Sequence, residues 1–165
     1  MQCERETSES LEFVTYRDAN LTTDKEYWKS ATGGFVTVGR MAVGWVYRKQ
    51  GGVLLSTMVV EYTTASVMGQ KLLGIPGMLG EFRGTFMEPM ALRVDNQPAL
   101  KQLDGEKASS KAKHIDIRIK FVVHYTTCGV LKPDYCESKY MPAAVLTKAL
   151  AAPRLSKLQV LVGLQ

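Results

Sequence analysis

This 165-residue chain is 45% hydrophobic and 22% charged, with a formal net charge of +5. These proportions are ordinary for a globular protein, and the length suits one domain with a proper core. No run of about 18 apolar residues occurs, so the composition predicts no membrane-spanning helix.

The N-terminal residues 1–10 are polar and acidic, which predicts a short flexible lead-in rather than a secretory signal peptide. One domain is expected over residues 11–165. Cys3, Cys128 and Cys136 are widely scattered without metal-ligand spacing, which fits free thiols in a reducing compartment. We therefore expect an intracellular protein, in the cytoplasm or nucleus, that is not secreted.

The first part of the domain predicts three strands. Residues 11–16 form an apolar run that indicates a first strand. Residues 34–39 and 42–47 alternate apolar with small or polar side chains, and the Gly39-Arg40 pair between them signals a hairpin.

A helix is expected after the hairpin. Ser56 or Thr57 is a suitable N-cap, and apolar residues follow at roughly helical spacing. Residues 74–80 contain one proline and three glycines, so this segment is a poor helix former. Residues 90–94 then read as a buried strand, and Pro98 falls in the first turn of the next helix.

The last third predicts a helix, a strand and a final helix. Residues 113–126 carry apolar side chains in a helical pattern, and Gly129 fits a C-cap. Residues 130–135 form a short strand that must lie at an edge, because its proline cannot donate to a hydrogen-bond ladder. A proline in the first turn fits a final helix over residues 142–150.

Three acidic residues stand at informative places in these elements. Asp18 follows the first strand, Glu61 lies in the first helix, and Asp95 closes strand 90–94. Carboxylates at strand ends, together with one from a helix packed across them, are typical of a magnesium site that cuts phosphodiesters.

The sequences around these residues carry a stronger signal than their spacing. Six collinear motifs occur: Tyr16-Arg-Asp-Ala-Asn20; Ser30-Ala-Thr-Gly-Gly-Phe-Val36 with Trp45 and Arg48-Lys-Gln50; Leu55-Ser-Thr-Met-Val-Val-Glu-Tyr62; Asp95-Asn-Gln-Pro-Ala99; Lys113-His-Ile-Asp-Ile-Arg118; and Pro142-Ala-Ala-Val-Leu-Thr-Lys148. Over nearly the whole chain they resemble the ribonuclease H domain that ends the polyprotein of copia-type retrotransposons. This resemblance implies an α/β fold of the ribonuclease H type, with a central mixed five-stranded sheet flanked by helices.

The chain departs from the family pattern in several places. The family's first motif reads roughly Tyr-Ser-Asp-Ala-Asp, matched here by Tyr16-Arg-Asp-Ala-Asn20. Ala144 stands where the family has its fourth aspartate, at what we expect to be a solvent-facing helix start. Val59 replaces an acidic residue. Together with the Pro- and Gly-containing segment 74–80, these changes suggest a copy drifting without selection, although loops also absorb such residues easily.

The resemblance implies hydrolysis of the RNA strand of RNA–DNA hybrids by a two-metal mechanism. Asp18 would bridge two Mg²⁺ ions, for which Mn²⁺ can substitute, and Glu61 and Asp95 would hold the ion on the leaving-group side. Because Ala144 has no ligand oxygen, activity is expected to be weak or lost. Asp134 and Glu137, the nearest acidic residues, are not expected to reach the site.

The positive charge is clustered. One segment contains Lys107, Lys111, Lys113, Arg118 and Lys120, and another contains Lys148, Arg154 and Lys157. Such clusters occur both on solvated helix faces and on nucleic-acid-binding surfaces. With the resemblance, we interpret the first segment as the surface that contacts the phosphates of an RNA–DNA hybrid. The reverse transcriptase part of the same polyprotein is a further expected partner.

Two other functions remain open at this stage. One is a catalytically inactive, hybrid-binding remnant. The other is an unrelated actin-like or integrase-like protein of the same topology, and the motifs argue against this second alternative. His124 is expected to be a partly buried helix residue, whereas His114 could be structural or contact the hybrid. Asp116 is expected to pair with a nearby basic side chain.

Overall fold

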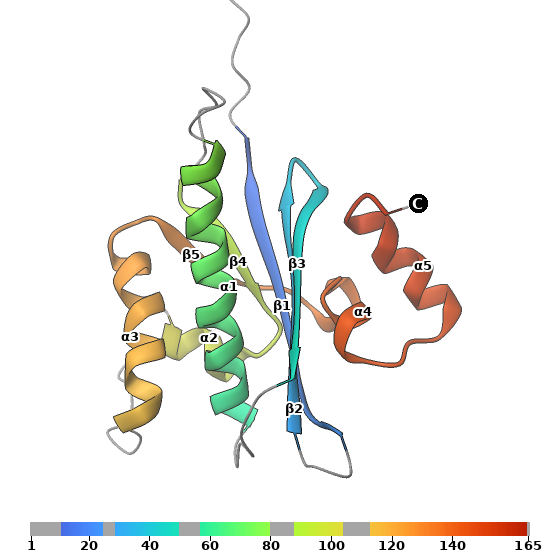
Figure 1. Cartoon of the computed structure of the whole chain (residues 1–165), viewed down its shortest axis with the longest axis horizontal. Helices are drawn as coiled ribbons and strands as arrows, with labels where there is room; N and C mark the ends of the chain where they lie inside the picture. The colour runs from blue at the N-terminus through green and yellow to red at the C-terminus, as the bar shows by residue number, and fades with distance from the viewer. Residues whose placement is uncertain (1–10, 25–28, 50–56, 80–87, 104–112, 165) are drawn as a thin grey trace, which may run out of the picture.

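The fold is a central sheet with helices on both faces (Figure 1). The structure is a computed structural model that describes residues 11–24, 29–49, 57–79, 88–103 and 113–164. The predicted lead-in, residues 1–10, lies outside the described residues. Among the described helices, none combines the length and the apolar character needed to cross a bilayer.

The sheet has five strands in the spatial order β3-β2-β1-β4-β5. They are β1 (Phe13–Asp24), β2 (Lys29–Val38), β3 (Met41–Lys49), β4 (Met90–Val94) and β5 (Leu131–Tyr135). The pairs β1–β2 and β2–β3 are antiparallel, whereas β1–β4 and β4–β5 are parallel. The predicted mixed five-stranded sheet is therefore confirmed, with the proline-containing strand β5 at an edge.

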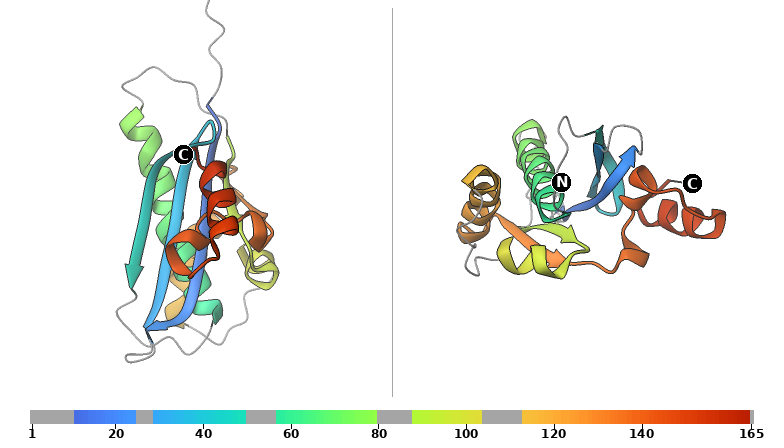
Figure 2. Two further views of the ribbon diagram at one scale, coloured as in Figure 1. Left: turned by 90° about the vertical axis from the view of Figure 1, so that its right-hand side faces the viewer. Right: turned by 90° about the horizontal axis from the view of Figure 1, so that it is seen from below.

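Helices cover the two faces unequally. Seen from below, α1 (Thr57–Leu79) and α3 (Lys113–Thr127) lie on one side of the sheet, and α4 (Ala144–Thr147) and α5 (Ala152–Leu161) lie on the other (Figure 2). The short helix α2 (Gln97–Leu103) follows β4, as the position of Pro98 predicts. A single 3₁₀ turn, Ser138–Tyr140, connects β5 to α4.

The larger core lies between the sheet and α1, α2 and α3. Strand β4 shows how the sequence builds it: Met90, Leu92 and Val94 are buried, and the residues between them face the other side. This alternation follows from the two-residue period of a strand. A smaller cluster on the opposite face, around Phe35 and Met141, packs α4 and α5 against the sheet.

The β2–β3 hairpin turns where the sequence predicts it. Gly39 and Arg40 have φ angles of 53° and 71°, so both central residues are left-handed, as a tight hairpin turn between twisted strands requires. Gly129, with φ of 74°, follows the end of α3 and confirms the predicted C-cap position.

The structure corrects the boundaries of β1 and α1. Strand β1 begins at Phe13 and continues to Asp24, well beyond the predicted 11–16. Helix α1 continues to Leu79, through most of the segment expected to be a poor helix former. Leu72 is buried and Ile75 packs against the larger core, so tertiary packing outweighs the weak local propensity here.

The C-terminal end differs most from the prediction. The expected final helix 142–150 shrinks to the four residues of α4, because Lys148 already has an extended backbone (φ −128°, ψ 144°). Helix α5 was not predicted. Pro153 in its first turn and the spacing of Leu155, Leu158 and Val162 are the sequence signals that could have identified it.

Two adjacent glycines in β2 allow helices to approach both faces of the sheet. A Cβ atom at Gly34 would collide with the Met68 side chain of α1. On the other face, a Cβ atom at Gly33 would lie 2.6 Å from Thr147 Cγ2 and 3.2 Å from the Ala143 carbonyl oxygen. The close seating of α4 on the sheet therefore depends on Gly33.

We predict that Gly33→Ala destabilises the fold by about 2 kcal/mol, because α4 must move away from β2. Gly44→Ala is the matched control in the neighbouring strand, since a Cβ atom there meets nothing within 4 Å. It should change the free energy of unfolding by no more than about 0.5 kcal/mol. Urea unfolding of both variants measures the difference. Equal effects would contradict the close packing of α4.

Candidate active site

The candidate site opens where two parallel strands part. Strands β1 and β4 pair from Val14↔Ala91 to Tyr16↔Arg93, and the register ends there. Asp18 and Asp95 each stand two residues beyond this last pair. By strand alternation they share the α4 face of the sheet with Tyr16, so the two carboxylates approach each other across the opening.

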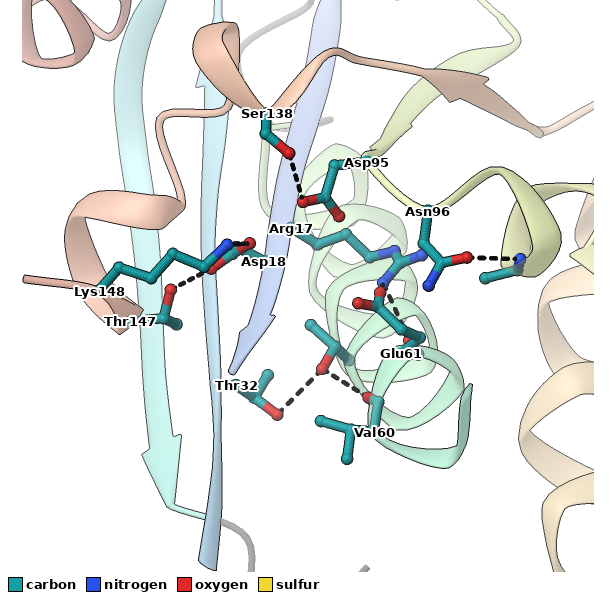
Figure 3. A network of polar contacts seen from close by, with 12 residues as sticks. Arg17, Asp18, Thr32, Val60, Glu61, Asp95, Asn96, Ser138, Thr147 and Lys148 are labelled. Carbon is teal, nitrogen blue, oxygen red and sulfur yellow. Dashed lines mark hydrogen bonds and ion pairs between the residues drawn. The ribbon is translucent and has the colours of Figure 1, made fainter. Parts of the chain in front are cut away.

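Asp18 is fully buried and held by the end of α4. Thr147 Oγ1 donates to Oδ2 of Asp18, and Lys148 Nζ lies 2.7 Å from Oδ1 (Figure 3). Asn20 Nδ2 donates to the Thr147 carbonyl oxygen at 2.9 Å. Both oxygens of Asp18 are therefore engaged by α4 and the residue after it.

Asp95 has one engaged and one free oxygen. Ser138 Oγ donates to Oδ2 at 3.3 Å, while Oδ1 is buried without a hydrogen-bond partner within the described part of the chain. Burial raises the pKa of Asp95, and the neighbouring Asp18 raises it further. The next residue, Asn96, caps α2 by accepting a bond from the backbone N–H of Ala99 at 3.0 Å.

Glu61 reaches the site from α1, on the other face of the sheet. It meets Arg17, whose Nη1 donates to Glu61 Oε2 and, at 3.1 Å, to the Glu61 carbonyl oxygen (Figure 3). Burial raises the pKa of Glu61, and the Arg17 guanidinium acts in the opposite direction. Removing one partner of such a buried pair typically costs about 3–5 kcal/mol, because the other charge stays buried.

The three carboxylates thus enter one region but do not share one ligand position. Asp18 is bonded to Lys148, Glu61 to Arg17, and Asp95 to Ser138. Within the described ranges, no three Asp, Glu, His or Cys side chains are placed to hold a metal ion. This arrangement does not fit the two-ion site that the motifs imply, and the roles of the carboxylates as metal ligands stay predictions.

Ala144 is buried, with 1% of its surface exposed, so the expectation of a solvent-facing helix start is wrong. The reason is the close approach of α4 to β2 over Gly33, which leaves the first residue of α4 against the sheet. As expected, the nearby acidic residues serve other contacts: Asp134 pairs with Arg93, and Glu137 pairs with Lys139.

The predicted hybrid-binding segment is described only in part. Lys107 and Lys111 lie outside the described residues, and Lys113 is the first residue of α3. Arg118 donates to Thr63 Oγ1 at 2.6 Å and so ties α3 to α1, whereas Lys120 is exposed. A role of these residues in contacting nucleic acid stays a prediction.

Sequence reasoning placed one histidine incorrectly. His124 is exposed on α3, with its ring 5.2 Å from the Tyr125 ring centroid, and is not partly buried. The helical pattern directs the apolar neighbours Val122 and Val123 inward instead. His114 and Asp116 belong to the first turn of α3, and their expected roles stay predictions.

The site also contains residues that sequence reasoning missed. The motif comparison assigns no role to Arg17, and it does not connect Thr147 or Lys148 to Asp18. A signal for Arg17 was available in strand alternation, because Phe13, Thr15 and Arg17 share one face and Phe13 belongs to the core. A basic residue on a core-facing position requires an acidic partner.

Comparison with known sequences agrees with the motif analysis. No established family profile matches the chain. The retrovirus-related Pol polyprotein of transposon TNT 1-94 from Nicotiana tabacum is 28% identical over 149 residues, 90% of this chain. That of transposon RE1 from Arabidopsis thaliana is 27% identical over 142 residues, 86% of this chain. The chain spans only about a tenth of the length of these relatives (11% and 10%).

Solved structures establish the fold. LC11-RNase H1, isolated from compost, superposes with a TM-score of 0.64 at 15% identity, covering 82% of this chain and 92% of that one. Its complex with an RNA/DNA hybrid gives a TM-score of 0.60 at 16% identity, covering 82% and 94% of the two chains. This is the ribonuclease H fold. The ribonuclease H-like chain also superposes on prototype foamy virus protease-reverse transcriptase, with a TM-score of 0.51 at 14% identity over 96% of this chain and 21% of that one.

The homologues of this ribonuclease H-like chain are thus Pol polyproteins of copia-type transposons, as the motifs predict. The match to transposon TNT 1-94 covers 90% of the chain. The actin-like or integrase-like alternative has no support from these relatives.

Asp95→Asn should stabilise the protein near neutral pH. The pKa of Asp95 is higher in the folded than in the unfolded state. The protein therefore has its full stability below the unfolded pKa, and it loses stability as the pH rises through the folded pKa and the buried carboxyl group ionises. The amide removes this loss, so the variant should be more stable than the parent at pH 7. The two should converge near the ordinary Asp pKa of about 3.9. Urea unfolding across this range measures the difference, and a variant less stable at pH 7 would contradict this electrostatic account.

Proposed function

We propose that this ribonuclease H-like domain binds RNA–DNA hybrids as part of a transposon Pol polyprotein and hydrolyses the RNA strand only weakly. The observation that carries this proposal is the neutralisation of two site carboxylates by the chain's own cations. Arg17 pairs with Glu61 and Lys148 pairs with Asp18.

Hybrid binding is supported by the fold and by charge. The structural neighbour LC11-RNase H1 is known in complex with an RNA/DNA hybrid, although this likeness at 16% identity concerns the fold. The net charge of +5 favours binding to a polyanion. The exposed Lys120 on α3 belongs to the segment that we assign to phosphate contact.

The weakness of hydrolysis is proposed from the candidate site. The family resemblance implies Mg²⁺, or Mn²⁺ in its place, held by Asp18, Glu61 and Asp95. The metal would activate water and stabilise the leaving oxygen. The described arrangement does not offer these three carboxylates to a common ion. At the fourth position, Ala144 offers a methyl group in place of a ligand.

A second candidate function is a hybrid-binding domain with no hydrolytic activity. The Arg17–Glu61 pair favours it, because a buried guanidinium beside a carboxylate removes the negative charge that would attract a divalent ion. The two candidates differ only in residual cleavage, so one assay separates them.

The reverse transcriptase part of the same polyprotein is the proposed partner. Support comes from the much longer Pol relatives and from the superposition of nearly the whole chain on part of a viral protease-reverse transcriptase. An intracellular location stays a prediction.

The function is tested with a labelled RNA strand annealed to DNA. We expect the protein to bind this hybrid in the presence of a metal chelator, and to cleave it slowly with Mg²⁺ and then Mn²⁺; binding without any cleavage would favour the second candidate. Absence of hybrid binding would overturn the proposal. Rapid metal-dependent cleavage that is abolished by Asp18→Asn would overturn the proposed weakness of the site.

Hybrid binding should also weaken steeply with salt, partly through Lys120. Lys120→Ala should reduce the slope of log affinity against log salt by about one, the effect of one lost phosphate contact. Lys71→Ala also removes one positive charge from an exposed position, on α1; it is the control and should leave the slope unchanged. Equal slopes for the parent and both variants would remove Lys120 from the predicted contact surface.

A further inference from the structure

The candidate site contains an unusual buried cation. Arg17 is completely buried and is the largest such side chain in the described part of the protein. Strand alternation places it on the α1 face of the sheet with Phe13 and Thr15, and its Cα pairs with Gly34 of β2. Gly34 has no side chain, and the Met68 side chain of α1 packs over it on this face.

Among the described residues, Glu61 is the hydrogen-bond partner of the Arg17 guanidinium and carries the opposite charge. Nη1 bonds both the carboxylate and the backbone carbonyl of Glu61, whereas Nε and Nη2 are buried without a partner in the described ranges. Because only one nitrogen of this guanidinium is hydrogen-bonded, hydrogen bonding is not its main contribution to the site. Its main contribution is a positive charge beside a buried carboxylate.

We propose that Arg17 is a built-in cation that takes the place of a bound divalent ion at Glu61 and thereby closes this carboxylate site to metal. The inference deepens the proposed function, on which it rests for the assignment of Asp18, Glu61 and Asp95 as one site. It accounts for the absence of a shared ligand position among these residues, since the guanidinium engages the Glu61 oxygen that would otherwise face an ion.

Arg17, rather than Lys148, holds the site closed. The Lys148 side chain is 34% exposed and follows the end of α4, so its flexible stem can turn toward solvent and release Asp18. The Arg17 side chain has no exposed surface and begins in the middle of β1. If the guanidinium moved away from Glu61, its charge would stay buried without a partner, which is far more costly.

The chain retains oxygen atoms that could bind an ion once the guanidinium is removed. Asp95 Oδ1 is already buried and unpartnered within the described residues, and replacement of Arg17 would release Glu61 Oε2. Asp18 would complete a set of three carboxylates once the metal ion displaces the Lys148 side chain from it. Arg17→Ser, which introduces the residue of the family pattern at this position, should therefore create a divalent-cation site.

The test measures Mn²⁺ binding to the purified protein by electron paramagnetic resonance, with thermal unfolding in Mn²⁺ or in chelator as a second readout. The parent should bind no Mn²⁺ at the site and show the same Tm in both buffers. Arg17→Ser should bind Mn²⁺ at least about tenfold more tightly than any residual binding by the parent, and its Tm should rise with Mn²⁺ because the ion binds the folded state. The matched control Arg17→Ser/Glu61→Gln should lose both effects.

Glu61→Gln in the parent background provides a variant that does not depend on the folding of Arg17→Ser. If Arg17 replaces the ion, this change lowers the Tm equally in Mn²⁺ and in chelator. Stoichiometric Mn²⁺ binding by the parent that Glu61→Gln abolishes would overturn the inference. So would a folded Arg17→Ser protein whose Mn²⁺ affinity equals that of the parent.

Hybrid binding by the parent in chelator is measured in parallel. Its loss would reject the proposed function while leaving the metal measurement intact. Conversely, a parent that binds both hybrid and Mn²⁺ through Glu61 would reject the role of Arg17 and keep the hybrid-binding proposal.

Discussion

Successive side chains of a strand point to opposite faces of a sheet, and at the end of the β1–β4 pairing this rule separates Arg17 from Asp18. Arg17 faces α1 and meets Glu61, whereas Asp18 faces α4 and meets Thr147 and Lys148. The Arg17–Glu61 pair buries both charges and tolerates little displacement, whereas Lys148 is 34% exposed and can turn away from Asp18. The state of the site therefore follows from two adjacent residues of one strand.

The same strand region also fixes the positions of the covering helices. Gly33 and Gly34, the β2 partners of Asp18 and Arg17, lack side chains on the faces that α4 and α1 occupy. The close seating of α4 brings Thr147 to Asp18 and buries Ala144 against the sheet. A carboxylate introduced at Ala144 would consequently enter a packed position, and it would meet a site in which Arg17 still holds Glu61.

The sequence predicts the fold well where local signals are strong. The left-handed pair Gly39-Arg40, the buried strand β4 and the proline at edge strand β5 all follow from short-range chemistry. Helix α1 runs on to Leu79 because distant core contacts outweigh its proline and glycines. The partners Arg17 and Glu61 are 44 residues apart and belong to different motifs, so a motif comparison finds the carboxylate but not its counter-ion.

A crystal structure of the unmodified protein grown in excess Mn²⁺, with anomalous scattering recorded for manganese, tests the central claim most directly. The account predicts that Arg17 remains bonded to Glu61 and that no anomalous peak occurs between Asp18, Glu61 and Asp95. A manganese peak coordinated by these carboxylates, with the Arg17 guanidinium displaced from Glu61, would contradict it.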